Sequence, residues 1–341
     1  MEAQLIETAI LNIVNHQCLI ATKAARVCYA AKGDNVMEFG LRRAQGPDSG
    51  TYGARAAVIG GCNGTSNVLA GQMFHVPVLG THAHSWIMSF PDEYTAFRKY
   101  AELYPSACIL LVDTYDITQG IKNAITVGLE MKERGETLSA IRIDSGDLSW
   151  RAKQARKMLD EAGLTETGIV LSNDLDEYTI KSIKDSGAQV NSWGVGTKLT
   201  TAYDQPALGG VYKLAAKRET ADSEWQDCIK VSGQAAKLTT PGVLDVRRYF
   251  HEDGRLAGDM VFDINHGVER ERIVDPADEI RQKSLAGLAY TTLLEPIVRT
   301  GIRVVDPSFG NAMEARERCR EQLDLLDESS KAASSTRTHI Q

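Results

Sequence analysis

The stretch AIRIDSGDLSWRAKQARKMLDEAGLTETGIVLSND, residues 140–174, decides the fold class. It begins with a short, mostly apolar run, continues in a helical pattern over Leu148–Ala162, and ends in a second apolar run, Gly168–Ser172. Both runs are too short and too apolar for strands with one solvent-exposed face, so they predict parallel strands buried under helices. In such folds ligands bind at the carboxyl ends of the strands, and polar residues follow both runs here.

The same alternation of strands and helices extends over residues 36–200. About seven strands in repeats of ~25–35 residues favour a TIM-like (β/α) barrel of mostly parallel strands over an open sheet, and we assign it to residues 36–215. The other strands are predicted at Val36–Phe39, Ser66–Leu69, Val76–Leu79, Cys108–Asp113 and Val190–Val195. The other helices are predicted at Asp92–Tyr104, Ile117–Arg134 and Asp176–Ser186.

The flanking regions follow different patterns. Apolar residues at helical spacing predict one long helix within residues 1–35, whose apolar face needs a partner on the barrel or on another chain. Residues 216–328 are predicted to form a β-rich module with a hairpin turn at Glu252–Arg255 and a helix at Met313–Leu326, and residues 329–341 a disordered tail. Strands after residue 210 are predicted at Val211–Lys217, Ile229–Val231, Val246–His251, Asp259–Ile264 and Thr291–Val298.

The composition is that of an ordinary globular protein. The 341 residues are 43% hydrophobic and 24% charged, and the net charge of −7 argues against a nucleic-acid or membrane-surface binder. No run approaches the ~18 apolar residues that span a bilayer. No secretory signal is visible, and six scattered cysteines without a CxxC pair are typical of reduced thiols. We therefore expect a cytoplasmic protein.

Two carboxylates follow the strand predicted at Ala140–Asp144. Asp144 and Asp147, preceded by Arg142, could hold Mg²⁺ or the hydroxyls of a ribose. Asp147 or Ser145 could instead cap the helix that follows. Both interpretations stay open from the sequence alone.

Two other strand ends could bind a ligand. The backbone N–H groups of Gly194–Lys198 could surround a phosphate, although the pattern is neither a Walker loop nor a GxGxxG motif. Ser172–Asp176 could contact the same ligand, or Asp174 could simply cap a helix.

Histidines and an aromatic–arginine pair complete the candidates. His82 and His84 would point the same way on a strand and could bind a metal, but a single acid–base or nucleophilic histidine is the better functional interpretation. A structural role is also open, in which the histidine is hydrogen-bonded within the mouth of the barrel and contacts no ligand. Phe39 could stack on a flat anionic ring while Arg42 or Arg43 pairs with its carboxylate or phosphate; otherwise Phe39 is core and Arg43 is solvated.

Taken in order, these segments resemble the nicotinate phosphoribosyltransferases, type II phosphoribosyltransferases of NAD salvage. The resemblance implies the conversion of nicotinate and 5-phosphoribosyl 1-pyrophosphate (PRPP) to nicotinate mononucleotide and pyrophosphate, with Mg²⁺ and with ATP hydrolysis coupled through a phosphohistidine. It also implies a homodimer with shared pockets. The segments that carry it are EAQLIETAILNIVNHQCLIATKAARV, EFGLRRAQGPDSG, GGCNGTSNVLAG, GTHAHSW, IRIDSGDL, VLSNDLDE, WGVGTKL and PALGGVYKL.

The resemblance also implies roles for individual residues. His84 would be the phosphorylated residue, and His84 and Asp144 the catalytic ones, with Asp144 and Asp147 as metal candidates. Ser66 stands where nicotinamide-specific relatives have an aspartate, which favours nicotinate. The predicted substrate-binding residues are Phe39, Arg42, Ser66, Arg142, Ser172, Asn173, Gly194, Gly196 and Thr197.

One departure from the family pattern keeps further hypotheses open. Family members usually carry a long segment before the helix that opens this chain, including an aromatic residue that reaches the neighbouring subunit's ring pocket. The chain could therefore be an inactive or split-enzyme fragment that binds or assembles with a separate N-terminal partner chain. It could also be a nicotinamide- or quinolinate-using relative, or a phosphate-binding aldolase with Lys198 as its Schiff-base lysine.

Overall fold

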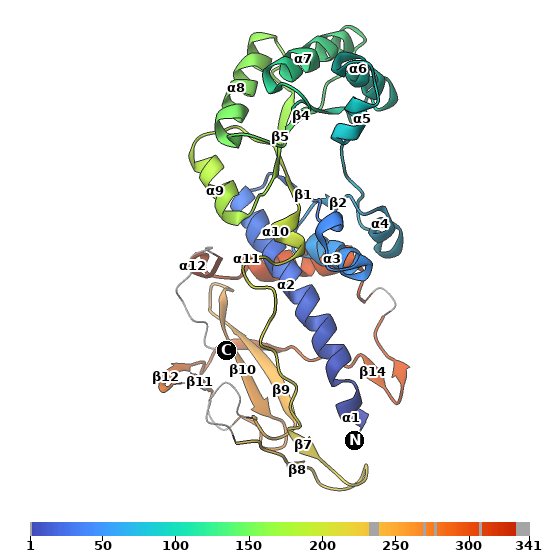
Figure 1. The fold of residues 1–341 in the computed structure, drawn as a ribbon. Coiled ribbons are helices and arrows are strands. Elements are labelled where there is room, and N and C mark those ends of the chain that lie inside the picture. The colour runs from blue at the N-terminus through green and yellow to red at the C-terminus, as the bar shows by residue number, and fades with distance from the viewer. Residues whose placement is uncertain (1, 232–238, 269–270, 276–277, 307–308, 332–341) are drawn as a thin grey trace. The chain divides into compact units, whose positions relative to one another are not determined.

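The computed structural model describes residues 2–231, 239–268, 271–275, 278–306 and 309–331 (Figure 1). The chain divides into two compact units. The first, here called the sheet unit, comprises His16–Ala207 and Asn311–Glu317. The second, the β-rich unit, comprises Met1–Asn15, Leu208–Gly310 and Arg318–Gln341.

The sheet unit is built on β1 (Asn35–Glu38), β2 (Gly64–Thr65), β3 (Ile109–Leu111), β4 (Ala140–Ile143), β5 (Gly168–Asn173) and β6 (Ser192–Val195). These six strands form one parallel sheet in the order β2-β1-β6-β5-β4-β3. The predicted α/β class with buried parallel strands is thereby confirmed. Because all six strands run the same way, their carboxyl ends meet at one edge of the sheet.

The predicted closed barrel is not formed by the strand pairing that the structure describes. β2 and β3 are the outer strands, and the segment predicted as a strand at Val76–Leu79 makes only one bridge, between Val78 and Thr65. This segment contains Pro77, which has no N–H to donate to a regular ladder. It continues to His82, whose Nε2 accepts a hydrogen bond from the N–H of Leu111 at 3.2 Å.

The strand predicted at Ser66–Leu69 is also wrong. The structure has a helix there, α4 (Val68–Phe74), and Asn67 is its N-cap, accepting from the N–H of Ala70 at 3.1 Å. Asparagine is among the preferred N-cap residues, and this local hydrogen bond favours a helix over a strand.

Helices flank the sheet and follow the strands (Figure 1). The longer ones are α2 (Glu7–Ala31), α3 (Pro47–Ile59), α6 (Glu93–Leu103), α7 (Ile117–Glu133), α8 (Leu148–Glu161) and α9 (Glu177–Asp185). Short ones are η1 (Leu41–Arg43), α5 (His84–Met88) and α10 (Thr197–Thr200). Four of these helices have an aspartate N-cap whose side chain accepts a hydrogen bond from the first turn. The N-caps of α6, α7, α8 and α9 are, in order, Asp92, Asp116, Asp147 and Asp176.

Side chains of β1 alternate between two apolar clusters. Val36 joins the large cluster that includes the helices. Met37 and Phe39 join a smaller cluster with Ala140 of β4 and Val170 of β5. β1 and β4 are separated by β6 and β5, and Val170 of β5 links their side chains, so one continuous apolar cluster covers this face of the sheet.

The N-terminal helix is divided between the units. After the single turn α1 (Glu2–Leu5), the first half of α2 exposes apolar side chains such as Ile10 and Ile13. Ile20 and Val27 in its second half are instead buried in the core of the sheet unit. None of the helices among the described residues is long and apolar enough to cross a bilayer.

The β-rich unit contains small antiparallel sheets, as predicted. β9 (Leu244–Phe250) lies between β10 (Leu256–Asp263) and β13 (Ala289–Thr292), and the predicted hairpin turn joins β9 to β10. Tyr249 is fully buried in its core. The remaining pairs are β7 (Ala216–Lys217) with β8 (Gln226–Asp227), β11 (Arg272–Asp275) with β12 (Asp278–Ser284), and β14 (Val298–Arg299) with β15 (Ile302–Arg303).

One smaller prediction in this part of the chain fails, and another meets the described residues only at its start. Ile229–Val231 lies in no strand, and the side chains of Ile229 and Val231 are largely exposed, so no sheet face holds them. The predicted disordered tail begins inside a helical turn, α12 (Glu328–Lys331), which follows α11 (Ala312–Asp324). Residues 332–341 lie outside the described residues.

A pair of helical glycines tests how closely α7 packs on the sheet. A Cβ at Gly120 would lie 2.0 Å from the carbonyl oxygen of Val112, which is backbone and has no room to yield. We expect Gly120→Ala to destabilise the protein by about 2 kcal/mol in urea unfolding, because overpacking outweighs the gain of ~1 kcal/mol in helix propensity. Gly53→Ala in α3 is the matched control, since its nearest atom would lie at 3.6 Å. A Gly120→Ala protein as stable as the control would contradict this packing.

Candidate active site

The carboxyl ends of the strands bring together most of the predicted site residues. Arg142 of β4 is the central one and is 15% exposed. Its Nε donates to Ser172 Oγ at 2.8 Å, Nη1 to Thr81 Oγ1 at 2.8 Å, and Nη2 to Asp144 Oδ1 at 3.1 Å. Ser172 also donates to Asp144 Oδ1. These bonds fix the guanidinium between β4, β5 and the segment before α5.

The Phe39 ring completes the apolar side of this cluster. The Cζ of Arg142 lies 5.2 Å from the ring centroid, within the range of a cation–π contact. A Cβ at Gly194 would lie only 2.6 Å from the Phe39 ring, so glycine is required there to seat the ring. A Cβ at Gly196 would lie 3.3 Å from the Phe39 carbonyl oxygen. Both glycines therefore have a packing reason in addition to the predicted phosphate contact.

His84 lies between two carboxylates. Its Nδ1 is 3.1 Å from Thr114 Oγ1, and its Nε2 is 4.0 Å from Asp113 Oδ1 and 3.9 Å from Asp144 Oδ2. The His84 side chain is 43% exposed, so a ligand can reach its Nε2. The two carboxylates would attract any positive charge that this ring acquires.

Asp113 is the buried carboxylate beside His84 and bonds the loop after β4. Its side chain is 1% exposed, and Oδ2 accepts from the Asp144 N–H at 2.9 Å and from the Ser145 hydroxyl at 2.7 Å. Its buried Oδ1 has no hydrogen-bond partner among the described residues. Asp113 therefore holds the loop after β4 and directs one unsatisfied oxygen toward the His84 ring.

His82 has a different environment. It is 7% exposed and stacks edge-on to Tyr100, with ring centroids 4.6 Å apart. Because Nε2 accepts from the Leu111 N–H, the neutral ring carries its proton on Nδ1. Burial lowers the pKa of His82 from 6.5 to about 4. The shared strand that would have pointed both histidines at one metal is absent, since α5 begins at His84.

The buried His82 predicts a pH dependence of stability. The folded protein binds a proton at His82 only near pH 4, whereas the unfolded chain does so near pH 6.5, so stability falls as the pH drops through this window. The loss approaches about 3 kcal/mol at ~1.4 kcal/mol for each pH unit. Urea unfolding of His82→Gln at pH 7 and at pH 4.5 should show a smaller loss than the wild type. An equal loss in both proteins would contradict the assignment.

Several predicted residues lie at the edge of the cluster or outside it. Arg42 is exposed in η1, and Ser66 is exposed after β2. Asn173 is exposed and has a φ of 108°, a left-handed backbone that non-glycine residues rarely adopt. Thr197 is the first residue of α10. Their predicted contacts with substrate remain predictions.

The carboxylates after the strands divide into two kinds. Asp147 accepts from the Trp150 N–H at 3.0 Å as the N-cap of α8, which was the capping interpretation. Asp176, rather than Asp174, caps α9. Asp144 caps no helix and is 25% exposed beside His84. It is therefore the better placed of the two metal candidates.

A metal site made of protein ligands alone is not present among the described residues: no group of three or more His, Cys, Asp or Glu side chains gathers closely enough. Mg²⁺ is commonly held by one or two carboxylates together with substrate phosphates and water. The partly exposed carboxylate of Asp144 and the unsatisfied oxygen of Asp113 fit that kind of site.

Lys198 does not suit the aldolase hypothesis. Its Nζ lies 2.7 Å from Asp176 Oδ2. The hydrogen bond to Asp176 raises the pKa of Lys198, whereas a Schiff-base lysine needs a lowered pKa.

The sequence analysis assigned no role to three residues of this site, Thr81, Asp113 and Thr114. Asp113 follows the apolar run CILLV and so had the same strand-end signal as Asp144. Thr81 lies in the segment GTHAHSW, but nothing in the sequence indicates its partner Arg142, which lies on a strand far along the chain.

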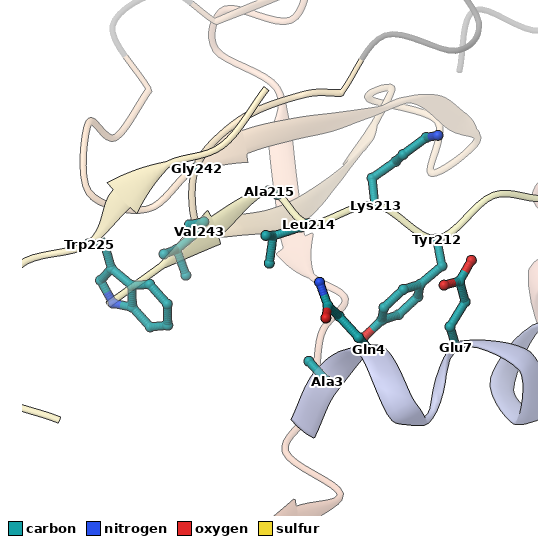
Figure 2. Close-up of a pocket in the computed structure, with 11 residues that line it drawn as sticks. Ala3, Gln4, Glu7, Tyr212, Lys213, Leu214, Ala215, Trp225, Gly242 and Val243 are labelled. Atoms are coloured by element: carbon teal, nitrogen blue, oxygen red, sulfur yellow. The ribbon is translucent and has the colours of Figure 1, made fainter. Parts of the chain in front are cut away.

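A cavity of about 370 Å³ lies elsewhere, within the β-rich unit. Figure 2 shows the Tyr212 ring beside Gln4 and Glu7 of the N-terminal helices. None of the predicted site residues lines it. Its lining residues are Ala3, Gln4, Glu7, Tyr212, Lys213, Leu214, Ala215, Ala216, Trp225, Gly242 and Val243.

Comparison with known proteins gives one family. Residues 35–238 match the model of the nicotinate phosphoribosyltransferase family. The chain is 48% identical over 307 residues to nicotinate phosphoribosyltransferase of Bacillus subtilis, covering 89% of this chain and 62% of the relative. The chain belongs to the nicotinate phosphoribosyltransferase family. Its membership confirms the resemblance seen in the sequence motifs, and the matched range contains every predicted site residue.

Another curated relative and two solved structures are also similar to this chain. A nicotinate phosphoribosyltransferase of Mycobacterium tuberculosis is 37% identical, with 96% of this chain and 64% of the relative covered. The crystal structure of human nicotinic acid phosphoribosyltransferase superposes with a TM-score of 0.78 at 28% identity, covering 99% of this chain and 73% of that one. Nicotinate-nucleotide pyrophosphorylase from Pyrococcus furiosus gives 0.71 at 27% identity, covering 94% and 73%. The chain thus spans less than two thirds of the two curated relatives' length.

Proposed function

We propose that this chain carries the active site of a nicotinate phosphoribosyltransferase, which forms nicotinate mononucleotide and pyrophosphate from nicotinate and PRPP. The observation that carries the proposal is the Arg142 cluster, in which one guanidinium contacts the Phe39 ring, Asp144 and Ser172. It places an aromatic surface beside charged and hydroxyl groups, as a pyridine ring next to a ribosyl pyrophosphate requires.

Each group has a role in the proposed reaction. The pyridine ring stacks on Phe39, and Arg42 from η1 pairs with the nicotinate carboxylate. Arg142 and Asp144 orient the ribosyl pyrophosphate, and the fixed positive charge of Arg142 favours departure of pyrophosphate from an oxocarbenium-like transition state. Mg²⁺, held by Asp144 and the substrate phosphates, would neutralise the same developing charge.

His84 is the proposed acceptor of the ATP phosphoryl group. Nδ1 is engaged by Thr114, so Nε2 is the nitrogen that attacks the γ-phosphorus, releasing ADP and forming a phosphohistidine. Hydrolysis of that phosphohistidine then returns His84 and releases phosphate. Thr114 would orient the ring through Nδ1, which leaves the lone pair of Nε2 for the attack, and Asp113 and Asp144 border that side of the ring.

The wider assembly is part of the same proposal. The segment from Val76 to His82, which bridges to β2 through Val78 and bonds to β3 through His82, supports a barrel-like domain. We propose a cytoplasmic homodimer with shared pockets, as the family resemblance implies.

Activity of the purified chain is the direct test of this function. We expect mononucleotide from nicotinate, PRPP and Mg²⁺, with a higher yield when ATP is added, and no turnover of nicotinamide or quinolinate. Turnover of either other ring would favour the corresponding relative. A folded chain that forms no product would contradict the proposal and favour the fragment that acts as a binding or assembly module.

Arg142→Lys should lower kcat/KM by about 100-fold, because lysine cannot bond three partners in one plane. The matched control is Arg156→Lys in α8, where the arginine bonds the Leu164 and Thr167 carbonyls. The control should keep kcat/KM within about twofold of wild type. Equal losses in both variants would show that the effect is not specific to the site.

His84→Ala should abolish the ATP-dependent gain in product, while His82→Gln should keep it. Steady-state assays with and without ATP, together with detection of acid-labile phosphate on the protein, measure this. The reverse result would move the phosphorylation to His82, against its burial.

A further inference from the structure

The carboxylate of Glu38 lies behind the candidate active site. Glu38 is the last residue of β1 and is 2% exposed. Successive side chains along a strand point to opposite faces, so Phe39 faces Arg142 while Glu38 points to the other face of the sheet. Glu38 therefore touches the loops of the site without facing the space where a ligand would bind.

Glu38 connects two segments, residues 39–43 after β1 and residues 65–67, which begin at the last residue of β2. Its Oε1 accepts from the N–H of Gly40, and its Oε2 accepts from the Thr65 hydroxyl at 2.6 Å. Thr65 Oγ1 accepts in turn from the N–H of Asn67 at 2.9 Å. All three hydrogen bonds are buried, and together they join one loop to the other through two side chains.

The direction of these bonds requires an acceptor at position 38. The Gly40 N–H and the Thr65 hydroxyl both donate to Glu38, and the bond to Glu38 uses the only proton of that hydroxyl, while its oxygen accepts from the Asn67 N–H. A glutamine would turn an NH₂ group toward one of these donors. A buried donor would then lose its acceptor.

The first loop has little room to shift. A Cβ on Gly40 would lie 2.4 Å from Cβ of Thr200, a residue of α10 that is 3% exposed. The backbone at Gly40 is thus held between Thr200 and the Glu38 carboxylate. Its position determines where Phe39 and Arg42 stand.

We propose that Glu38 is a positioning residue, which sets the Phe39–Arg43 loop against the loop that carries Ser66 and so shapes the nicotinate pocket between them. The identity of the ring that binds there rests on the proposed function. The mechanical role of Glu38 rests on the hydrogen bonds alone.

Amide hydrogen exchange tests this role without any activity. In Glu38→Gln and in Thr65→Val, we expect exchange at least about tenfold faster in peptides that cover residues 39–44 and 64–70, with the rest of the protein unchanged. Thr65→Ser keeps the hydroxyl and should exchange like wild type. Glu177→Gln is the control for a buried glutamate, since Glu177 is also 2% exposed but pairs with Lys23. Unchanged exchange in both Glu38→Gln and Thr65→Val would overturn the proposal.

Kinetics separates positioning from general damage. Glu38→Gln and Thr65→Val should raise KM for nicotinate about tenfold, leave KM for PRPP unchanged and keep kcat within about threefold. Wild-type KM for nicotinate in both variants would overturn the link to the pocket. If the wild-type chain makes no mononucleotide, the proposed function fails, while the exchange result still decides the role of Glu38.

Discussion

Burying the Arg142 guanidinium constrains the rest of the sheet unit. A charged group that is 15% exposed needs a partner for most of its donors, and Arg142 finds them on β5, on the loop after β4 and on the segment before α5. Those three segments are far apart in the sequence. Asp144 accepts from Arg142 and also lies beside His84, so the position of the guanidinium influences the surroundings of the histidine as well.

Two other buried polar side chains also link separate segments of the chain by hydrogen bonds. His82 links the segment before α5 to β3 through the Leu111 N–H, and Glu38 links the loops after β1 and β2. At β3 the His82 side chain supplies the acceptor for a backbone N–H, whereas at β1 the Glu38 side chain adds to regular backbone pairing. Individual buried side chains thus help to define the edge that holds the site.

The periodicity of the sequence was enough to predict the parallel sheet, its flanking helices and the β-rich part of the chain. The strand predicted at Ser66–Leu69 was wrong, because the side chain of Asn67 caps a helix there. Periodicity also could not separate His82 from His84. One becomes buried against Tyr100 and the other begins α5, a difference that depends on tertiary contacts.

The sequence could predict which strand ends contribute to the candidate site, but not how their side chains contact one another. Asp147 and Asp144 have the same local pattern, and only the structure shows that Asp147 caps α8. The contact between Phe39 and Arg142 joins residues of strands that are separated by two others in the sheet. Sequence periodicity carries no information about strand order.

The contact between Phe39 and Gly194 has a consequence for how this site can evolve. Any side chain at residue 194 would overlap the Phe39 ring, so such a substitution is accessible only after residue 39 has become smaller. The two positions should therefore show epistasis: a change at residue 194 that is harmful in the present background becomes neutral in a background with a small residue 39. A library built to widen the ring pocket would have to vary both residues together.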